Sequence, residues 1–133
     1  MLMKSDLIYP ELSYQLTGIT FKVFNNLGYG FQEKYYQRAI AYELKENKLF
    51  FKQEVFIPIK YNNKIIGRYF IDFVIENKIA IELKVGKEFY PKDWKQLAAY
   101  LKITKLPLGI LILITKDGIK FRRIANTKTN LLV

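Results

Sequence analysis

The chain of 133 residues carries 22 Lys and Arg against 12 Asp and Glu, a formal net charge of +10, and half of its residues are hydrophobic. This length predicts one compact domain over 1–133, and the charge favours a polyanion such as nucleic acid as partner. The absence of cysteine and histidine excludes disulfides, thiolate zinc sites and histidine-based catalysis, which leaves carboxylates, lysines and hydroxyls for any chemistry.

Two features of the chain bear on cofactor and location. A metal ion bound by carboxylates without thiolate or imidazole would be hard, meaning Mg²⁺ or Mn²⁺. The opening residues, 1–6, lack the apolar run and the cleavage site of a secretory signal. The most apolar stretch, 106–115, contains Pro107 and is too short to cross a bilayer as a helix. We therefore expect a cytoplasmic protein with no membrane partner.

Apolar residues at helical spacing predict a helix over 11–27 and a second over about 32–46. Glu33 lies one turn before Tyr36 on the inward stripe of the second helix, so its carboxylate is expected to face the body of the protein. The alternative for Glu33 is that its charge only favours the helix N-terminus. The cluster Asn25, Asn26, Gly28 and Gly30 interrupts the first helix before the second begins.

Three runs rich in β-branched and aromatic residues follow, over 49–61, 64–75 and 79–85. Short polar turns join them, which predicts an antiparallel meander. Pro58 in the first run indicates an edge strand or a bulge, because proline cannot donate to a sheet ladder.

The last part of the chain predicts a helix that begins near Pro91, a strand over 108–115 buried on both faces, and a final strand over 119–124 before a polar tail. The order of elements is therefore ααβββαββ, which is typical of an α/β layer arrangement. No repeat, linker or low-complexity segment divides it.

The hairpin over 64–85 holds the residues with chemical potential. Residues two apart in a strand share a face, so Glu82 and Lys84 project together from the third strand. On the second strand, Asp72 is expected on the face opposite an apolar row. That row consists of Ile71, Phe73 and Ile75.

The register of this hairpin decides whether the two carboxylates meet. A three-residue loop over 76–78 pairs Ile75 with Ile79 and therefore Asp72 with Glu82. A two-residue loop would scatter the apolar faces instead. The three-residue loop is our prediction.

Two opposed carboxylates on a partly buried sheet repel each other unless a proton or a cation lies between them. A divalent metal would satisfy Asp72 and Glu82, and the ammonium of Lys84 could stabilise charge on a phosphoryl group. Whether Lys84 also acts as a base stays open. The competing interpretation is an ordinary solvated strand face, against which the apolar flanking sequence argues. Glu54 is an extra ligand or a solvated strand residue.

Three segments resemble a known family. The segment 30–36, Gly-Phe-Gln-Glu-Lys-Tyr-Tyr, fits the motif of the GxxExxY proteins, a branch of the PD-(D/E)XK nuclease superfamily. Asp72 followed by 82–84, Glu-Leu-Lys, resembles the superfamily's catalytic core, and 96–100, Gln-Leu-Ala-Ala-Tyr, is similar to its glutamine-bearing helix. The resemblance extends over about 11–124.

The resemblance implies a restriction-endonuclease-like fold, a central mixed sheet flanked by helices. The geometry of the carboxylates and lysine, together with the basic charge, predicts a phosphodiesterase that uses Mg²⁺ or Mn²⁺ and acts on DNA in preference to RNA. The resemblance also implies that Asp72 and Glu82 bind the metal with the Leu83 backbone carbonyl, and that Glu33 completes the site. Lys84 would then position the attacking water. Gln96 would contact the phosphate or the water.

Some positions depart from the family pattern, and others are candidates for contacts to nucleic acid. Phe24, Tyr29 and Phe70 stand where relatives often carry histidine, proline and arginine. The departures leave the carboxylate and lysine core intact. The expected nucleic-acid contacts are Arg68, Lys87, Lys92, Lys95 and Tyr100. Gln96 and Tyr100 could also be mere neighbours on a helix surface.

Two other functions remain open from the sequence. One is a catalytically silent nucleic-acid-binding module with the same fold. The other is an antitoxin-like or scaffold protein whose basic face contacts a protein. A homodimer is also possible, because enzymes of this fold that cut both strands often pair their active sites.

Overall fold

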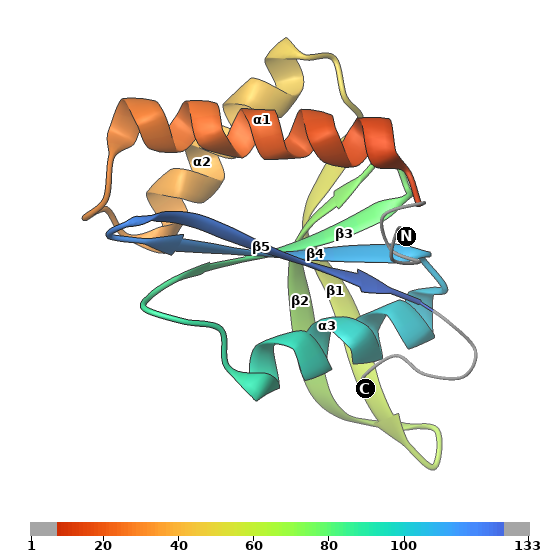
Figure 1. Ribbon diagram of the computed structural model, residues 1–133. Coiled ribbons are helices and arrows are strands. Elements are labelled where there is room, and N and C mark those ends of the chain that lie inside the picture. The colour runs from red at the N-terminus through yellow and green to blue at the C-terminus, as the bar shows by residue number, and fades with distance from the viewer. Residues whose placement is uncertain (1–7, 127–133) are drawn as a thin grey trace, which may run out of the picture.

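A computed structural model describes residues 8–126 of the chain (Figure 1). The segment 1–6 and the predicted polar tail after residue 126 lie outside these residues. Along the chain the elements are α1 (Pro10–Leu27), α2 (Glu33–Glu46), β1 (Phe51–Tyr61), β2 (Lys64–Ile75), β3 (Ile79–Val85), α3 (Pro91–Thr104), β4 (Leu108–Thr115) and β5 (Gly118–Ala125). The predicted order ααβββαββ is confirmed.

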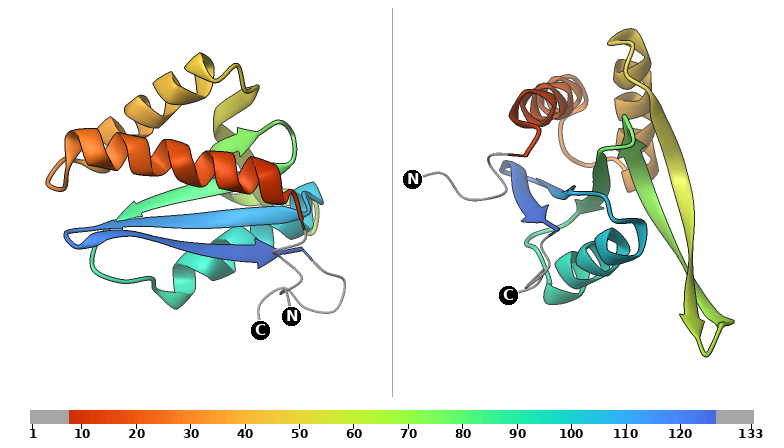
Figure 2. Two further views of the ribbon diagram at one scale, coloured as in Figure 1. Left: turned by 45° about the horizontal axis from the view of Figure 1, so that its top comes forward. Right: turned by 90° about the vertical axis from the view of Figure 1, so that its right-hand side faces the viewer.

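The five strands form one sheet in the order β1-β2-β3-β4-β5. Only β3 and β4 run parallel, so the sheet is mixed, as expected for the restriction-endonuclease-like fold. Helices α1 and α2 cover one face and α3 covers the other (Figures 1 and 2). Since α3 connects the parallel pair, it returns the chain across that second face.

Each face of the sheet has its own apolar core. The core under α1 and α2 includes Leu16 and Tyr36, and the core under α3 includes Leu97 and Leu101. All eight residues of β4 are buried, which confirms the predicted strand with both faces covered. Gly109 in β4 lets α3 approach closely, because a Cβ there would lie 2.9 Å from Cγ of Leu97. Within residues 8–126, no helix is both long enough and apolar enough to span a membrane.

The loop between α1 and α2 shows why the 30–36 motif has its spacing. Gly30 has a φ of 118°, a backbone conformation that residues with a Cβ rarely adopt. Tyr36 is fully buried in the first turn of α2, and its hydroxyl donates to the carbonyl of Gly28 at 2.5 Å. This bond attaches the loop to the helix and places Glu33 at the first position of α2.

The turn between β2 and β3 follows the predicted register. Ile75 pairs with Ile79 and Phe73 with Ile81, which leaves a three-residue loop. Its first two residues, Glu76 and Asn77, both have a φ of 55°. The predicted register is therefore confirmed as far as Phe73 and Ile81, which directly adjoin Asp72 and Glu82.

The prediction that Ile71 shares a face with Phe73 and Ile75 is wrong. Ile71 packs in the core under α3, whereas Phe73 packs in the core under α1 and α2. The alternation breaks at Asp72, and the break has two visible causes. Glu54, which lies opposite on β1, has a left-handed φ of 47°, and the pairing of β2 with β3 ends at Phe73.

Beyond this break, β1 and β2 continue as a long hairpin that extends past α3 (Figure 2). β1 is an edge strand, as Pro58 indicated, and its register with β2 shifts between Ile59 and Lys60. Edge position and bulge explain how the sheet tolerates a proline.

Candidate active site

Asp72 and Glu82 meet where β2 and β3 separate. The backbone N–H of Leu83 donates to Oδ2 of Asp72 at 2.7 Å, and the backbone N–H of Asp72 donates to Oε1 of Glu82 at 3.2 Å. Each carboxylate therefore takes the place of a lost backbone partner on the opposite strand. These two bonds orient both side chains.

Glu82 is buried and Asp72 is half-buried, and this changes the acidity of both carboxyl groups. Glu82 is 4% exposed, and burial together with the charge of Asp72 raises its pKa to about 8. Burial also raises the pKa of Asp72, against the opposing effect of its bond from Leu83. Burial and the repulsion between the two charges outweigh the effect of Lys84, so Glu82 mostly keeps its proton at neutral pH in the metal-free protein.

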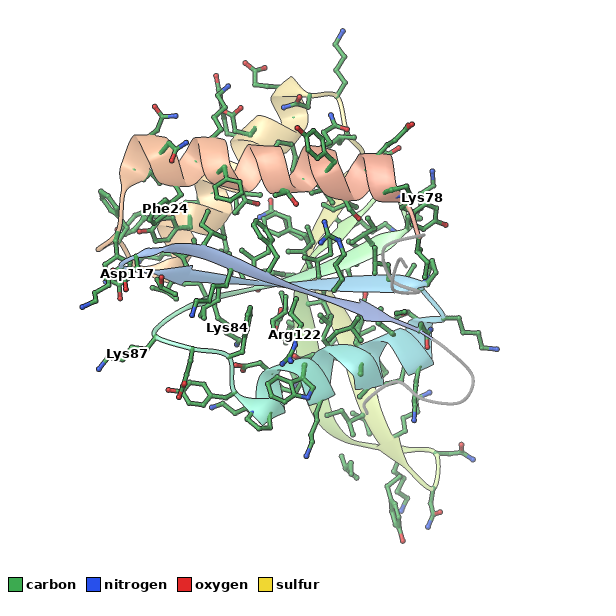
Figure 3. The ribbon with its side chains drawn as sticks, viewed as in Figure 1. Phe24, Lys78, Lys84, Lys87, Asp117 and Arg122 are labelled. Carbon is green, nitrogen blue, oxygen red and sulfur yellow. The ribbon has the colours of Figure 1, made fainter. Side chains whose placement is uncertain are left out.

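Lys84 provides the nearest cation. Its Nζ lies 4.0 Å from Oε2 of Glu82, and its side chain is 36% exposed. Glu82 and Lys84 share a face of β3, as predicted from their spacing. It is the face toward α3, because Ala80, two residues earlier, packs in the core under α3. Figure 3 shows Lys84 at the end of the sheet that also carries Lys87. The ammonium can therefore contact both the buried pair and a group arriving from solvent.

Glu33 lies in the electrostatic neighbourhood of this pair but is not a third ligand in this structure. Its pKa is raised mainly by burial and next by the charge of Asp72, while Lys84 lowers it. However, no three carboxylates come close enough to hold a metal ion in the part of the chain that the structure describes. The expected ligand set of Glu33, Asp72 and Glu82 is thus not assembled.

Tyr69 is a site residue that the sequence did not reveal. Its hydroxyl lies 3.1 Å from Oε2 of Glu82 and 3.0 Å from Oε1 of Gln96, so it connects β2, β3 and α3. A hydroxyl has one proton, so the second contact needs a proton from Glu82 or from the Gln96 amide. Burial and the charge of Glu82 raise the pKa of Tyr69, which keeps it a neutral donor.

Asp93 is a second residue near the site that the sequence analysis did not single out. It is 4% exposed, and its Oδ2 accepts the backbone N–H of Tyr90 at 3.2 Å, which caps the start of α3. Its charge also contributes to the raised pKa of Glu33. An Asp in the first turn of a predicted helix is the only sequence signal it carries.

The predicted nucleic-acid contacts separate into two groups. Lys87, Lys92 and Lys95 are exposed, and Lys92 borders the same small cleft as Lys84. Tyr100 is only 2% exposed, which leaves little of its surface for a contact to nucleic acid. Arg68 alternates with Tyr69 and therefore points from the opposite face of the hairpin, away from the carboxylates.

The donor set of the Asp72–Glu82 pair fits a hard divalent cation. Oδ1 of Asp72 and Oε2 of Glu82 are the oxygens not used by the backbone donors. Mg²⁺ is commonly held by one or two carboxylates, with water and phosphate completing its shell. A cation there would also relieve the repulsion that raises the pKa of Glu82. The exposed Glu54, with its left-handed backbone, is not among these donors.

Comparison with known proteins identifies the class. The model of the PD-(D/E)XK nuclease superfamily matches residues 10–124, and this chain belongs to that superfamily. The crystal structure of SSO0001 is similar over 88% of this chain with a TM-score of 0.55 and 22% identity, which shows a shared fold. The chain spans 57% of the length of that protein. No curated protein matches it.

Proposed function

We propose that this protein is a metal-dependent nuclease of the GxxExxY branch that hydrolyses phosphodiester bonds in DNA. The observation that carries the proposal is the Asp72–Glu82 pair, in which Glu82 is buried and Asp72 half-buried, with Nζ of Lys84 4.0 Å from Oε2 of Glu82. Membership of the nuclease superfamily and the net charge of +10 support a nucleic-acid substrate.

Each residue of the site has a proposed role. Asp72, Glu82 and the Leu83 carbonyl would hold Mg²⁺ or Mn²⁺, which when bound supplies a Lewis acid for the phosphodiester. Lys84 orients the attacking water and stabilises charge that develops on the phosphate oxygens. Glu33, at the start of α2, would act on the pair through its charge, and Gln96 would contact the phosphate from α3, with its side chain held by the hydroxyl of Tyr69.

The test is gel-resolved cleavage of labelled single-stranded, duplex, flapped and four-way-junction DNA, and of RNA, with Mg²⁺ or Mn²⁺. We expect cleavage by the wild type that requires metal and disappears in Lys84→Ala. Lys102→Ala, which removes an exposed lysine from α3, is the matched control and should cleave normally. Metal-independent cleavage, or equal loss in both variants, would contradict the proposed site.

A silent nucleic-acid-binding module is the second candidate, and one observation favours it. The three expected carboxylate ligands do not gather within residues 8–126, and each paired carboxylate already accepts a backbone bond. Titration with Mn²⁺ by calorimetry separates the candidates. A nuclease should bind Mn²⁺ in a manner lost in Asp72→Asn, whereas a silent module should bind DNA and no Mn²⁺ at this pair.

A further inference from the structure

A basic cleft opens beside the candidate active site. It has a volume of about 480 Å³, within the range of roughly 300–1,000 Å³ typical of small-molecule sites. Because β3 and β4 are parallel, their C-terminal ends emerge at the same edge of the sheet and form its floor. The cleft is lined by Tyr29, Gly86, Lys87, Thr115, Lys116, Asp117 and Lys120.

The charge of this cleft favours an anion. Lys87, Lys116 and Lys120 are all exposed, and none of them forms an ion pair with a residue between 8 and 126. Asp117 is the single acidic residue in the lining. The hydroxyl of Thr115 donates to the carbonyl of Gly118 at 2.8 Å, so it is occupied within the turn. Three lysines against one carboxylate leave a net positive cleft for phosphate.

Tyr29 adds a different kind of surface. It belongs to the loop between α1 and α2, and its side chain is 47% exposed at the edge of the cleft. An exposed aromatic ring next to basic residues is the arrangement on which unpaired bases stack. Phosphate on the lysines and a base on Tyr29 together describe a nucleotide.

The basic cleft adjoins a smaller cleft at the candidate catalytic residues. Gly86 lines both this cleft and a smaller one of about 180 Å³, whose charged lining residues are Lys84, Lys92, Glu88 and Asp93. Figure 3 shows Lys84, Lys87 and Asp117 at the same end of the sheet. A strand whose phosphate lies at Lys84 can therefore extend directly into the basic cleft.

We propose that this cleft binds the nucleotide next to the scissile phosphate, with its phosphate at Lys87, Lys116 and Lys120 and its base stacked on Tyr29. A base can stack on a side chain only when it has left the duplex stack. The substrate is therefore DNA with an unpaired nucleotide beside the cut, such as a single strand, a flap or a frayed end. That the bound DNA is a substrate rests on the proposed nuclease function, whereas the test below measures binding alone.

The test uses fluorescence anisotropy of a labelled oligothymidylate with EDTA present, so that no cleavage occurs. The double variant Lys116→Ala/Lys120→Ala should weaken binding at least tenfold. It should also lower the slope of log affinity against log salt by about 1.4, since each lost phosphate contact on a single strand contributes about 0.7. The control is Lys45→Ala/Lys105→Ala, which removes two exposed lysines elsewhere and should change the slope less.

Tyr29→Ala tests the stacking surface separately. It should weaken binding of oligothymidylate about tenfold and leave binding of an abasic oligomer of equal length unchanged, since the abasic oligomer has phosphates and no bases. Two results would overturn the assignment of the cleft. One is that Tyr29→Ala weakens binding of the abasic oligomer as much as binding of oligothymidylate. The other is that the two double lysine variants lose the same affinity for oligothymidylate. The proposed nuclease activity fails by a different result, the absence of metal-dependent cleavage.

Discussion

Asp72 and Glu82 hold each other in place across a gap between two strands. Asp72 donates its backbone N–H to Glu82 and accepts the backbone N–H of the residue that follows Glu82, at 3.2 and 2.7 Å. The two carboxylates are thus positioned by the protein before any cation binds. Such preorganisation reduces the rearrangement that metal or substrate binding would require.

The raised pKa of Glu82 predicts a metal-free protein that loses stability in mild base. Between its usual value of 4.5 and about 8, Glu82 keeps its proton in the folded protein and has released it in the unfolded chain. The unfolded state then binds fewer protons, so the free energy of unfolding falls as pH rises through this window. Thermal unfolding with EDTA should show a Tm several degrees lower at about pH 9 than at about pH 5.

The control for this pH dependence is Glu82→Gln, which keeps the shape of the side chain and cannot ionise. Its Tm should change much less between the two pH values, and at about pH 9 it should exceed that of the wild type. Parallel pH profiles for the two proteins would show that the Asp72–Glu82 pair does not govern stability in base.

Divalent cations should stabilise the folded protein through the same pair. We expect Mn²⁺ or Mg²⁺ to raise the Tm near pH 8, because a bound cation replaces the proton and removes the repulsion between the carboxylates. Asp72→Asn should abolish the shift. Glu11→Gln, which neutralises an exposed carboxylate on α1, should retain it. A shift equal in all three proteins would indicate nonspecific cation binding.

Tyr69→Phe should lower kcat about 10- to 100-fold with little effect on KM, because a hydrogen bond to an ionised group contributes roughly 1.5–3 kcal/mol. The loss arises because Oε2 of Glu82 and the side chain of Gln96 are no longer held together. Mn²⁺ affinity, measured by calorimetry, should fall as well. The matched control is Tyr100→Phe, since both tyrosines border the same shallow apolar cleft. Equal kcat values for the two variants would mean that Tyr69 has only a packing role.

Tyr36→Phe should reduce both stability and cleavage. It removes the hydroxyl that donates to Gly28, at a cost of about 1–2 kcal/mol in the free energy of unfolding. Cleavage should decrease because Glu33 lies one turn earlier on the helix that this bond anchors. Tyr35→Phe, at an exposed neighbouring tyrosine, should behave as the wild type in thermal unfolding and in the cleavage assay. If Tyr36→Phe and Tyr35→Phe had the same Tm and the same cleavage rate, the loop would not depend on the bond from Tyr36 to Gly28.

Local patterns in the sequence were sufficient for the order of elements, the faces of β3 and the turn between β2 and β3. The reason is that side-chain period and turn composition act over a few residues. Glu82 and Lys84 share a face whatever else the chain does, and a three-residue turn fixes which residues of the two strands meet. These features were enough to predict that Asp72 lies across from Glu82 and that Lys84 lies on the same face as Glu82.

Only the tertiary structure decided what surrounds them. The break in alternation at Asp72 depends on the left-handed backbone of Glu54 and on the separation of β2 from β3, neither of which is a local pattern. That break turns Tyr69 toward Glu82 and leaves Arg68 facing away. Burial of Tyr100 depends on how closely α3 packs on β4, which Gly109 permits. The sequence by itself thus determined that two carboxylates and a lysine come close together, and tertiary packing determined which other side chains surround them, because those neighbours come from distant segments.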